Sequence, residues 1–169
     1  MTIKTYAELT TLFADNVTGA ISPADLRDFL DSQRVYGSIV IQGGSTAQTF
    51  VSTTPELLTE WTADGISNGV TPAFATDKIT IDNTGIYKVD FFCSFQGANP
   101  VVNSFELRID DVATGLQFDR KTTSTDIGSG SFSGIISLTA AEVLTVWGTL
   151  TGGTSITVQE AALIVHRIS

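Results

Sequence analysis

Residues 78–96 read KITIDNTGIYKVDFFCSFQ, and the pattern of this stretch decides the fold of the chain. The first four residues alternate between polar and apolar, the Asn-Thr-Gly sequence at 83–85 has turn chemistry, and every second residue from Tyr87 to Phe95 is apolar. The stretch therefore predicts a strand, a tight turn and a long strand. Because the apolar face of the long strand carries aromatic rings, each contributing roughly 1.5–3 kcal/mol when fully buried, we place the centre of the core here.

The composition of the whole chain agrees with a single β-rich domain. Its 169 residues are enough for one domain with a sizeable core, and 42% of them are hydrophobic while only 16% are charged. Thr, Ser and Gly make up much of the polar part of the composition, and this favours strands joined by turns over helices. The net charge of −9 repels phosphate groups, so the chain is expected to bind neither nucleic acid nor an anionic membrane.

After residue 56 the chain predicts closely spaced strands separated by turn residues, with no helical period of useful length. Candidate strands cover residues 56–62, 71–75, 78–82, 86–96, 101–109, 115–121, 130–138, 143–150, 155–159 and 161–168. Asp110-Asp111 and Gly152-Gly153 mark two of the turns. This spacing favours an antiparallel β-sandwich of the jelly-roll kind and leaves an up-and-down barrel as the alternative.

Two late strands are apolar on both faces. In residues 143–150 and 161–168 one face is expected to fill the core, and the other must also be shielded from water. A second subunit would shield it, which predicts an oligomer; loops or the N-terminal helices are the alternative cover. The residues predicted to form the contact between subunits are Leu144, Val146, Ile164 and Ile168.

The first 34 residues differ in kind from the rest and predict two short helices. Thr5 and Glu8 form a capping-box pattern that opens a helix over residues 5–14, and Ser22, followed by Pro and an acid at the third helical position, opens another. Helices of about ten residues are marginal alone, so their apolar stripes need the main domain, another copy of the chain or a foreign surface. The residues predicted to attach the chain to such a surface are Leu9, Leu12, Phe13, Ile21, Leu26, Phe29 and Leu30.

We therefore divide the chain into three parts. Residues 1–34 form a helical attachment segment, residues 35–55 a connector or first strand, and residues 56–169 the jelly-roll domain. The boundary follows the Gly-Gly-Ser-Thr run at 43–46 and the polar residues after it, whose composition is that of a turn or a semi-flexible connection.

No pattern in the sequence predicts catalysis, a metal site or a cofactor. Cys93 is the only cysteine and lies on the apolar face of the long strand, so it is expected to be a buried hydrophobic residue. His166 is the only histidine, and a metal site or catalytic triad built on it lacks the other members. Four acids in turns or at strand ends are weak candidates for a cation site or a glycosidase pair, because Asp is common there anyway. They are Asp110, Asp111, Asp119 and Asp126.

Three further features have simple interpretations. The glycine-rich run 128–134 feeds a strand and lacks a following Lys or helix, so it does not predict a phosphate site. The Asn16-Val17-Thr18 sequon has no signal peptide before it and is interpreted as a chance match. Trp61 is a candidate for stacking on a sugar, but a Trp in a strand is more often part of a core.

Two segments of the chain resemble the complement C1q and tumour-necrosis-factor family. They are residues 85–91 (GIYKVDF), which match a Gly-x-Tyr strand start, and residues 133–147 (SGIISLTAAEVLTVW), which match a later pair of strands. Where the family has Gly-Asp before the later strand, this chain has Ala141-Glu142. The resemblance covers residues 56–168 and implies a jelly-roll fold and a compact homotrimer.

The N-terminal segment resembles a leader of tailed-bacteriophage virion proteins, including fibre and head-decorating proteins. This resemblance rests on residues 6–29 (YAELTTLFADNVTGAISPADLRDF). It implies a non-enzymatic virion protein that its first 34 residues attach to a phage capsid or tail protein. The sequence has no long shaft repeat, which favours a capsid decoration or head-fibre protein. The alternative is a tail-fibre tip, or a receptor-binding module that recognises host-surface glycan.

The start of the chain also bears on where the protein is made. It has neither a cationic n-region nor an apolar h-region, and no stretch approaches the roughly 20 apolar residues of a membrane span. We therefore expect synthesis and assembly in the host cytoplasm, followed by incorporation into the virion.

Overall fold

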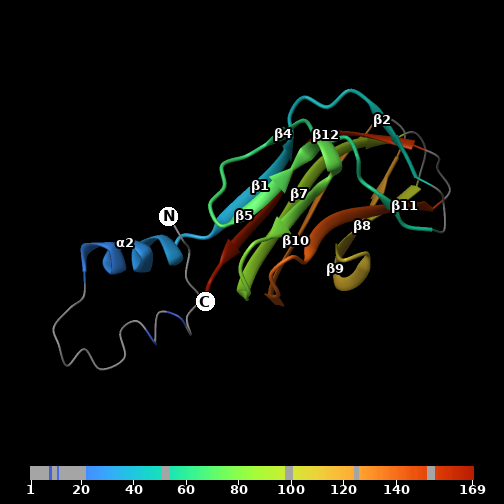
Figure 1. Ribbon diagram of the computed structural model, residues 1–169. Coiled ribbons are helices and arrows are strands. Elements are labelled where there is room, and N and C mark those ends of the chain that lie inside the picture. Colours follow the sequence, from blue (N-terminus) through green and yellow to red (C-terminus); the bar gives the residue numbers. More distant parts are fainter. Residues whose placement is uncertain are drawn as a thin grey trace.

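The computed structural model describes residues 8, 11, 22–50, 54–97, 101–123, 126–151 and 155–169. In this part of the chain two antiparallel sheets pack face to face as a sandwich, and one short helix precedes them (Figure 1). No helix among these residues is both long enough and apolar enough to cross a membrane. The predicted fold class, a mainly β antiparallel sandwich after a short helical segment, is confirmed.

In sheet A, β7 lies next to the edge strand and is bonded along both of its own edges. The strand order is β10 (Ile127–Leu138), β7 (Gly85–Gly97), β12 (Ser155–Arg167), β1 (Tyr36–Ile41) and β4 (Ala63–Asp64), with β2 (Ala47–Thr49) paired to the start of β12. β7 pairs with β10 and with β12 over nearly its whole length. The predicted strand over residues 86–96 is therefore the strand around which this sheet is built.

Sheet B covers the other side of the core. The strand order is β5 (Val70–Ala73), β6 (Lys78–Ile81), β11 (Val143–Thr151), β8 (Val101–Ile109) and β9 (Val112–Thr122), with β3 (Glu56–Leu57) paired to β11. A 3₁₀ turn, η1 (Phe74–Thr76), joins β5 to β6.

The connections between the sheets are those of a jelly roll. The chain changes sheet from β6 to β7, from β7 to β8, and again at each connection from β9 to β12. In an up-and-down barrel each strand is instead bonded to the next strand along the chain. The winding therefore excludes the barrel alternative.

The core is built around Phe91, in the middle of β7. Its ring centroid lies 5.0 Å from that of Phe132 on β10, 5.9 Å from Phe105 on β8, 6.3 Å from Phe118 on β9 and 6.4 Å from Trp61. Aromatic pairs at such distances contribute roughly 0.5–1.5 kcal/mol beyond their burial. The apolar face of the long strand is at most 3% exposed, which confirms the predicted centre of the core.

The glycine-rich run on β10 has a packing role. A Cβ atom added at Gly130 would lie 2.1 Å from the Phe118 ring, and one at Gly134 would lie 2.6 Å from the Leu116 side chain. Both large side chains come from β9, the edge strand of the opposite sheet. The missing side chains on β10 therefore make room for β9 side chains.

The Gly-x-Tyr sequence at the start of β7 fixes the end of the chain. A Cβ atom at Gly85 would lie 2.4 Å from Nε of Arg167 and 2.5 Å from the carbonyl oxygen of Ser169. Tyr87 is fully buried, and its hydroxyl donates to the carbonyl of Asn83 at 2.5 Å. Burial raises the pKa of Tyr87 to about 12, although the charge of Arg167 opposes the shift. The glycine leaves space for the C-terminal residues, and the tyrosine closes the turn before the strand.

The sandwich begins earlier in the chain than predicted. β1 is an inner strand of sheet A, paired with β12 on one side and with β4 on the other. Val35, just before it, is fully buried. Residues 36–41 therefore form the first strand of the jelly roll, which is one of the two roles predicted for residues 35–55, and the jelly roll extends to the N-terminal side of residue 56. The glycine run that suggested a boundary forms a turn, in which Gly43 has a φ of 60°.

Two predicted strand bounds are also corrected. The strands predicted at 155–159 and 161–168 are one strand, β12, with a shift of register between Val158 and Glu160. The strand predicted at 56–62 is reduced to the two residues of β3, yet Leu58 and Trp61 still enter the core. An irregular segment can bury apolar side chains as a strand does, so its sequence pattern resembles that of a strand.

Helix α2 (Pro23–Ser32) is the second of the two predicted helices. The Asp25 N–H donates to Oγ of Ser22 at 3.2 Å, and the Asp25 carboxylate accepts from the Ser22 N–H at 2.9 Å, which is the predicted capping interaction. Figure 1 shows α2 beyond one end of the sandwich, the end at which the C-terminus also lies. Of the helix predicted over residues 5–14, the structure describes only Glu8 and Thr11, both helical.

We expect Ala141→Gly to stabilise the protein. Ala141 has a φ of 77°, in the left-handed region that costs a residue with a Cβ roughly 1–2 kcal/mol, and its N–H is held by the Ile81 carbonyl at 2.7 Å. Glycine removes that cost but adds freedom to the unfolded chain, so we expect a net gain of about 1 kcal/mol in the free energy of unfolding. Urea denaturation at fixed protein concentration measures it. The control Ala140→Gly, at a neighbour without positive φ, should lower stability; a loss in both variants would contradict the prediction.

We expect Asp77→Asn to stabilise the protein at neutral pH and not at acid pH. Burial, with the charge of Glu60, raises the pKa of Asp77 from 3.8 to about 6. The ionised carboxylate is therefore less stable in the folded state, so the wild type loses stability as the pH rises from about 4 to about 6. The gain from the amide should reach about 1 kcal/mol above pH 6, after allowing for solvent screening.

Thermal unfolding between pH 4 and pH 8 measures the effect of Asp77→Asn. Asp111→Asn is the matched control, because Asp111 is also left-handed, with a φ of 66°. A pH-independent change in both variants would show that the backbone, and not the charge, is responsible.

Candidate functional site

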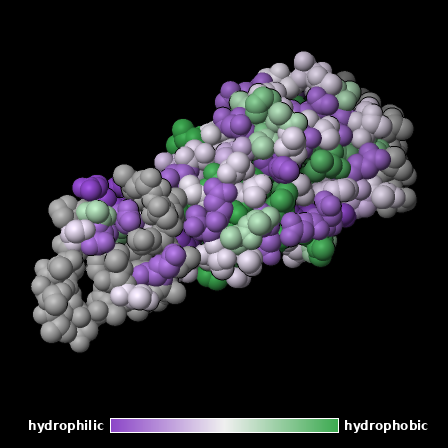
Figure 2. Space-filling model, viewed as in Figure 1, coloured by the Kyte–Doolittle hydropathy of each residue, from purple (hydrophilic) through white to green (hydrophobic). Residues whose placement is uncertain are grey.

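The outer face of sheet A is a mixed surface of apolar and small hydroxyl side chains. At its centre Phe92 on β7 lies between Ala162 on β12 and Ser131 on β10. Phe92 is 48% exposed, and in Figure 2 apolar patches alternate with polar side chains over the sandwich. The exposed apolar side chains on or beside this face are Ile86, Phe92, Ile127, Ile135, Ile164 and Ile168.

Small side chains keep the β10 side of this face flat. The outward residues of β10 at 129, 131, 133 and 137 are all exposed serines. β10 is also the edge strand of sheet A. A partner surface can therefore approach this part of the sheet closely.

The charges beside Phe92 cancel. Nζ of Lys88 lies 2.9 Å from Oδ2 of Asp90 on the same strand and the same face. Burial opposes ionisation of Asp90, but hydrogen bonds from Lys88 and Ser133 and the charge of Lys88 outweigh it and lower its pKa. The pair is thus an ionised one with no net charge, in a chain whose net charge is −9.

The structure corrects half of the predicted subunit contact. Leu144 and Val146 on β11 are fully buried between the two sheets, so their side chains cannot reach another subunit. Ile164 on β12 is 36% exposed on the outer face of sheet A, and Ile168 is 52% exposed just beyond the strand. The sequence of β11 is apolar on both faces, so its alternation did not reveal which face points into the core. In the structure the outward face is the one that carries Trp147.

The predicted attachment residues fall into two groups. Leu9, Leu12, Phe13 and Ile21 lie outside the described residues. On α2, Leu26 is 53% exposed and Leu30 is 50% exposed, whereas Phe29 is partly buried. The helix therefore presents two leucines to its surroundings.

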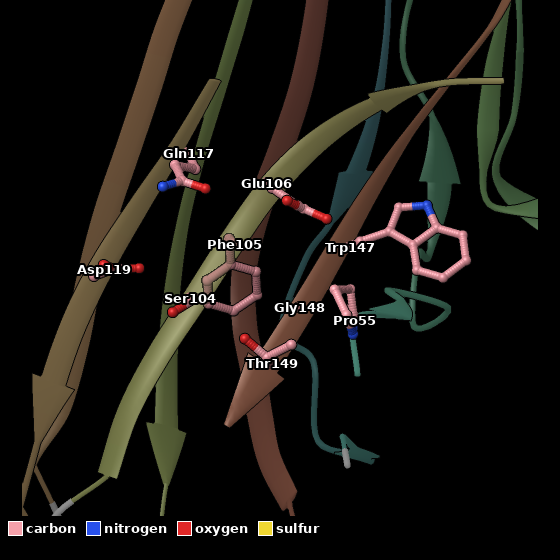
Figure 3. A pocket seen from close by; sticks show the side chains of 9 residues that line it. All are labelled: Pro55, Ser104, Phe105, Glu106, Gln117, Asp119, Trp147, Gly148 and Thr149. Atoms are coloured by element: carbon pink, nitrogen blue, oxygen red, sulfur yellow. The ribbon is translucent and has the colours of Figure 1, made fainter. Parts of the chain in front are cut away.

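A polar depression of about 280 Å³ lies on the outer face of sheet B (Figure 3). The adjacent strands β11, β8 and β9 contribute two rows of outward side chains. In the first row lie Trp147 on β11, Glu106 on β8 and Gln117 on β9. The second row is Thr149, Ser104 and Asp119. Figure 3 shows Gln117 and Asp119 on one side, Ser104 and Glu106 on the middle strand, and Trp147 with Pro55 on the other side.

The Trp147 ring at the edge of this depression is held in place. Its Nε1–H donates to Oγ1 of Thr145 at 2.9 Å, and the guanidinium of Arg108 lies 4.4 Å from the ring centroid. Arg108 is in turn fixed by Glu106, with Nη2 and Oε1 2.6 Å apart. The ring is only partly exposed, and sequence reasoning missed it as a site residue because β11 was interpreted as apolar on both faces.

The other candidates for chemistry occupy structural positions. Cys93 is 3% exposed and free, and burial raises the pKa of its thiol, as expected for a buried hydrophobic residue. Trp61 is 5% exposed and donates Nε1–H to the Leu58 carbonyl at 2.9 Å, which confirms its place in the core. His166 is exposed on sheet A. Among the residues that the structure describes, no group of three His, Cys, Asp or Glu side chains is placed to hold a metal ion.

The four acids lie at three separate places in the fold. Asp110 and Asp111 form the turn between β8 and β9, with φ of 47° and 66°, which confirms the predicted turn. Asp126 accepts a hydrogen bond from the Thr123 hydroxyl in the next connection. Asp119 alone of the four lines the depression on sheet B.

The fold is similar to that of solved C1q and tumour-necrosis-factor domains. A structure of Eiger TNF from S. frugiperda superposes with a TM-score of 0.61 and 14% identity, covering 81% of this chain and 94% of that one. The globular domain of zebrafish complement 1qA superposes with a TM-score of 0.60 and 14% identity, covering 80% and 98%. No protein-family model and no curated protein matches the sequence. The chain thus has a C1q/TNF-like jelly roll, in agreement with the first resemblance.

Proposed function

We propose that this chain is a non-enzymatic structural protein of a tailed-bacteriophage particle, a homotrimeric capsid decoration or head-fibre protein. The observation that carries the proposal is the exposed apolar surface around Phe92 on the outer face of sheet A, in a C1q/TNF-like sandwich. The resemblance of residues 6–29 to phage virion leaders supports the assignment to a phage particle, and the resemblance of the jelly roll to the C1q and tumour-necrosis-factor family supports the trimer.

A second copy of the chain is the occupant that suits the outer face of sheet A. Copies with a charge of −9 repel one another, so their contact must avoid net charge. Around Phe92 the face offers apolar side chains, serines and the cancelled Lys88–Asp90 pair. A contact between this face and a different surface of the next copy closes into a ring when the rotation between copies is a third of a turn.

The N-terminal segment is the proposed attachment to the particle. Helix α2 lies outside the sandwich, and among the residues that the structure describes the hydrophobic core begins at Val35. Half-exposed Leu26 and Leu30 suit a hydrophobic groove on a capsid or tail protein. Co-sedimentation with empty capsids of the parent phage tests this role. The full chain should bind and a chain lacking residues 1–34 should not; equal binding would contradict the attachment.

A receptor- or glycan-binding module, such as a tail-fibre tip, is the second candidate function. The observation that favours it is the depression beside Trp147. This site lies on sheet B, opposite the proposed contact between copies, so both functions can coexist in one trimer.

We expect the protein to have three times its 17.9 kDa chain mass in solution, and Phe92→Lys to reduce it to the mass of one chain. The substitution would bury an unpaired charge in the contact between copies. Light scattering coupled to size exclusion measures the mass. Phe74→Lys, at a 37% exposed phenylalanine on η1, is the matched control and should leave the trimer intact. Removal of residues 1–34 should also leave it intact. A wild-type monomer, or a trimeric Phe92→Lys variant, would contradict the proposed contact.

A further inference from the structure

We propose that the depression on the outer face of sheet B is a carbohydrate site that holds one neutral or amino hexose unit of a glycan. The inference rests on the second candidate function and not on the trimer, because all the lining residues belong to one chain. It names a ligand class and a set of contact residues for that function.

The size of the depression suits one sugar ring. Its volume of about 280 Å³ lies just below the range of roughly 300–1,000 Å³ that is usual for small-molecule sites. The small Ser104 on the middle strand, β8, leaves the hollow, while larger side chains rise on both sides. A single ring fits such a hollow, and the rest of a glycan can leave through its open side.

The aromatic wall suits the apolar side of a sugar. A pyranose ring has a surface of C–H groups and a rim of hydroxyls, and an indole ring offers a complementary apolar surface. Arg108 does not line the depression, so its guanidinium contacts Trp147 from outside the site. Because the indole N–H and the cation fix the ring before any ligand arrives, little side-chain freedom is lost on binding.

The polar wall suits the hydroxyl rim. Gln117 and Asp119 are exposed on β9, facing the hollow from the side opposite Trp147. The amide of Gln117 can both donate and accept, and the carboxylate of Asp119 can accept from two neighbouring hydroxyls. Ser104 and Thr149 add two hydroxyls between the walls.

The charges select the kind of sugar and argue against cleavage. Glu106 is neutralised by Arg108, which leaves the charge of Asp119 in a chain of net charge −9. A uronic or sialic acid would be repelled, whereas a neutral or amino sugar would not. Glycoside hydrolysis needs two carboxyl groups free to act as acid and base or nucleophile. Here one of the two carboxylates is held in an ion pair, so the site binds without cleaving.

The two tryptophans of the chain provide a built-in test. Isotope-labelled protein should give two indole N–H signals in an NMR spectrum, one from Trp147 in the depression and one from Trp61 in the core. The probes are glucose, galactose, N-acetylglucosamine, glucosamine and glucuronic acid, each added to about 10 mM because a shallow single-ring site is expected to have a Kd of about 1 mM. We expect at least one neutral or amino sugar to move the Trp147 signal and to leave the Trp61 signal in place.

Substitutions then assign the binding to the polar wall. Asp119→Asn should weaken the affinity about tenfold, because it removes a charged acceptor. Asp111→Asn, an exposed acid in the β8–β9 turn that does not line the depression, should leave it unchanged. The inference is overturned if no sugar moves the Trp147 signal, if glucuronic acid binds as tightly as the neutral sugars, or if both variants behave alike. A trimer that binds no sugar would overturn this inference alone, and a monomer that binds sugar would overturn only the proposed trimer.

Discussion

The packing of Phe91 against aromatic rings from both sheets is the interaction on which the rest of the structure depends. Phe132 reaches it from the same sheet, and Phe105 and Phe118 from the other. Because β7 is also bonded along both edges, the strand that carries Phe91 joins β10 to β12 within sheet A and packs against sheet B. The glycines of β10 follow from the same packing, since they make the space that the β9 side chains fill.

With the inner faces occupied by the core, the two outer faces are free to differ. Sheet A presents Phe92 among serines and a neutral ion pair, which suits a wide contact with another protein surface. Sheet B presents a hollow between Trp147 and Asp119, which suits a small polar ligand. Because successive side chains of a strand point to opposite faces, each outward residue of these two surfaces is held in place by the two core residues beside it in the chain. The proposed assembly and the proposed sugar site therefore use opposite sides of one sandwich.

The sequence predicted the features that depend on local pattern. The alternation from Tyr87 to Phe95 predicted the central strand, and Ser22 predicted the start of α2 through its capping chemistry. The features that depend on tertiary pairing were not predictable in this way. The role of residues 35–55 stayed open between a connector and a first strand, because the membership of β1 in sheet A depends on pairing with β12, more than a hundred residues later.

The same limit applies to the candidate sites. Leu144 was assigned to the surface because an alternating strand does not reveal which face points inward when both are apolar. The hollow on sheet B arises from three strands brought together by their register, and of the residues in it the sequence singled out Asp119 alone, for a different chemistry. A local signal was nevertheless present in Trp147, which alternates with the buried positions of its strand.

The outer face of sheet A is the proposed contact between copies. An electron cryomicroscopy structure of the assembled full-length protein would show this contact. We expect three chains around one axis, with Phe92 and Ile164 of each chain covered by a neighbour and Trp147 open to solvent. An assembly in which the outer face of sheet A faces solvent would contradict it.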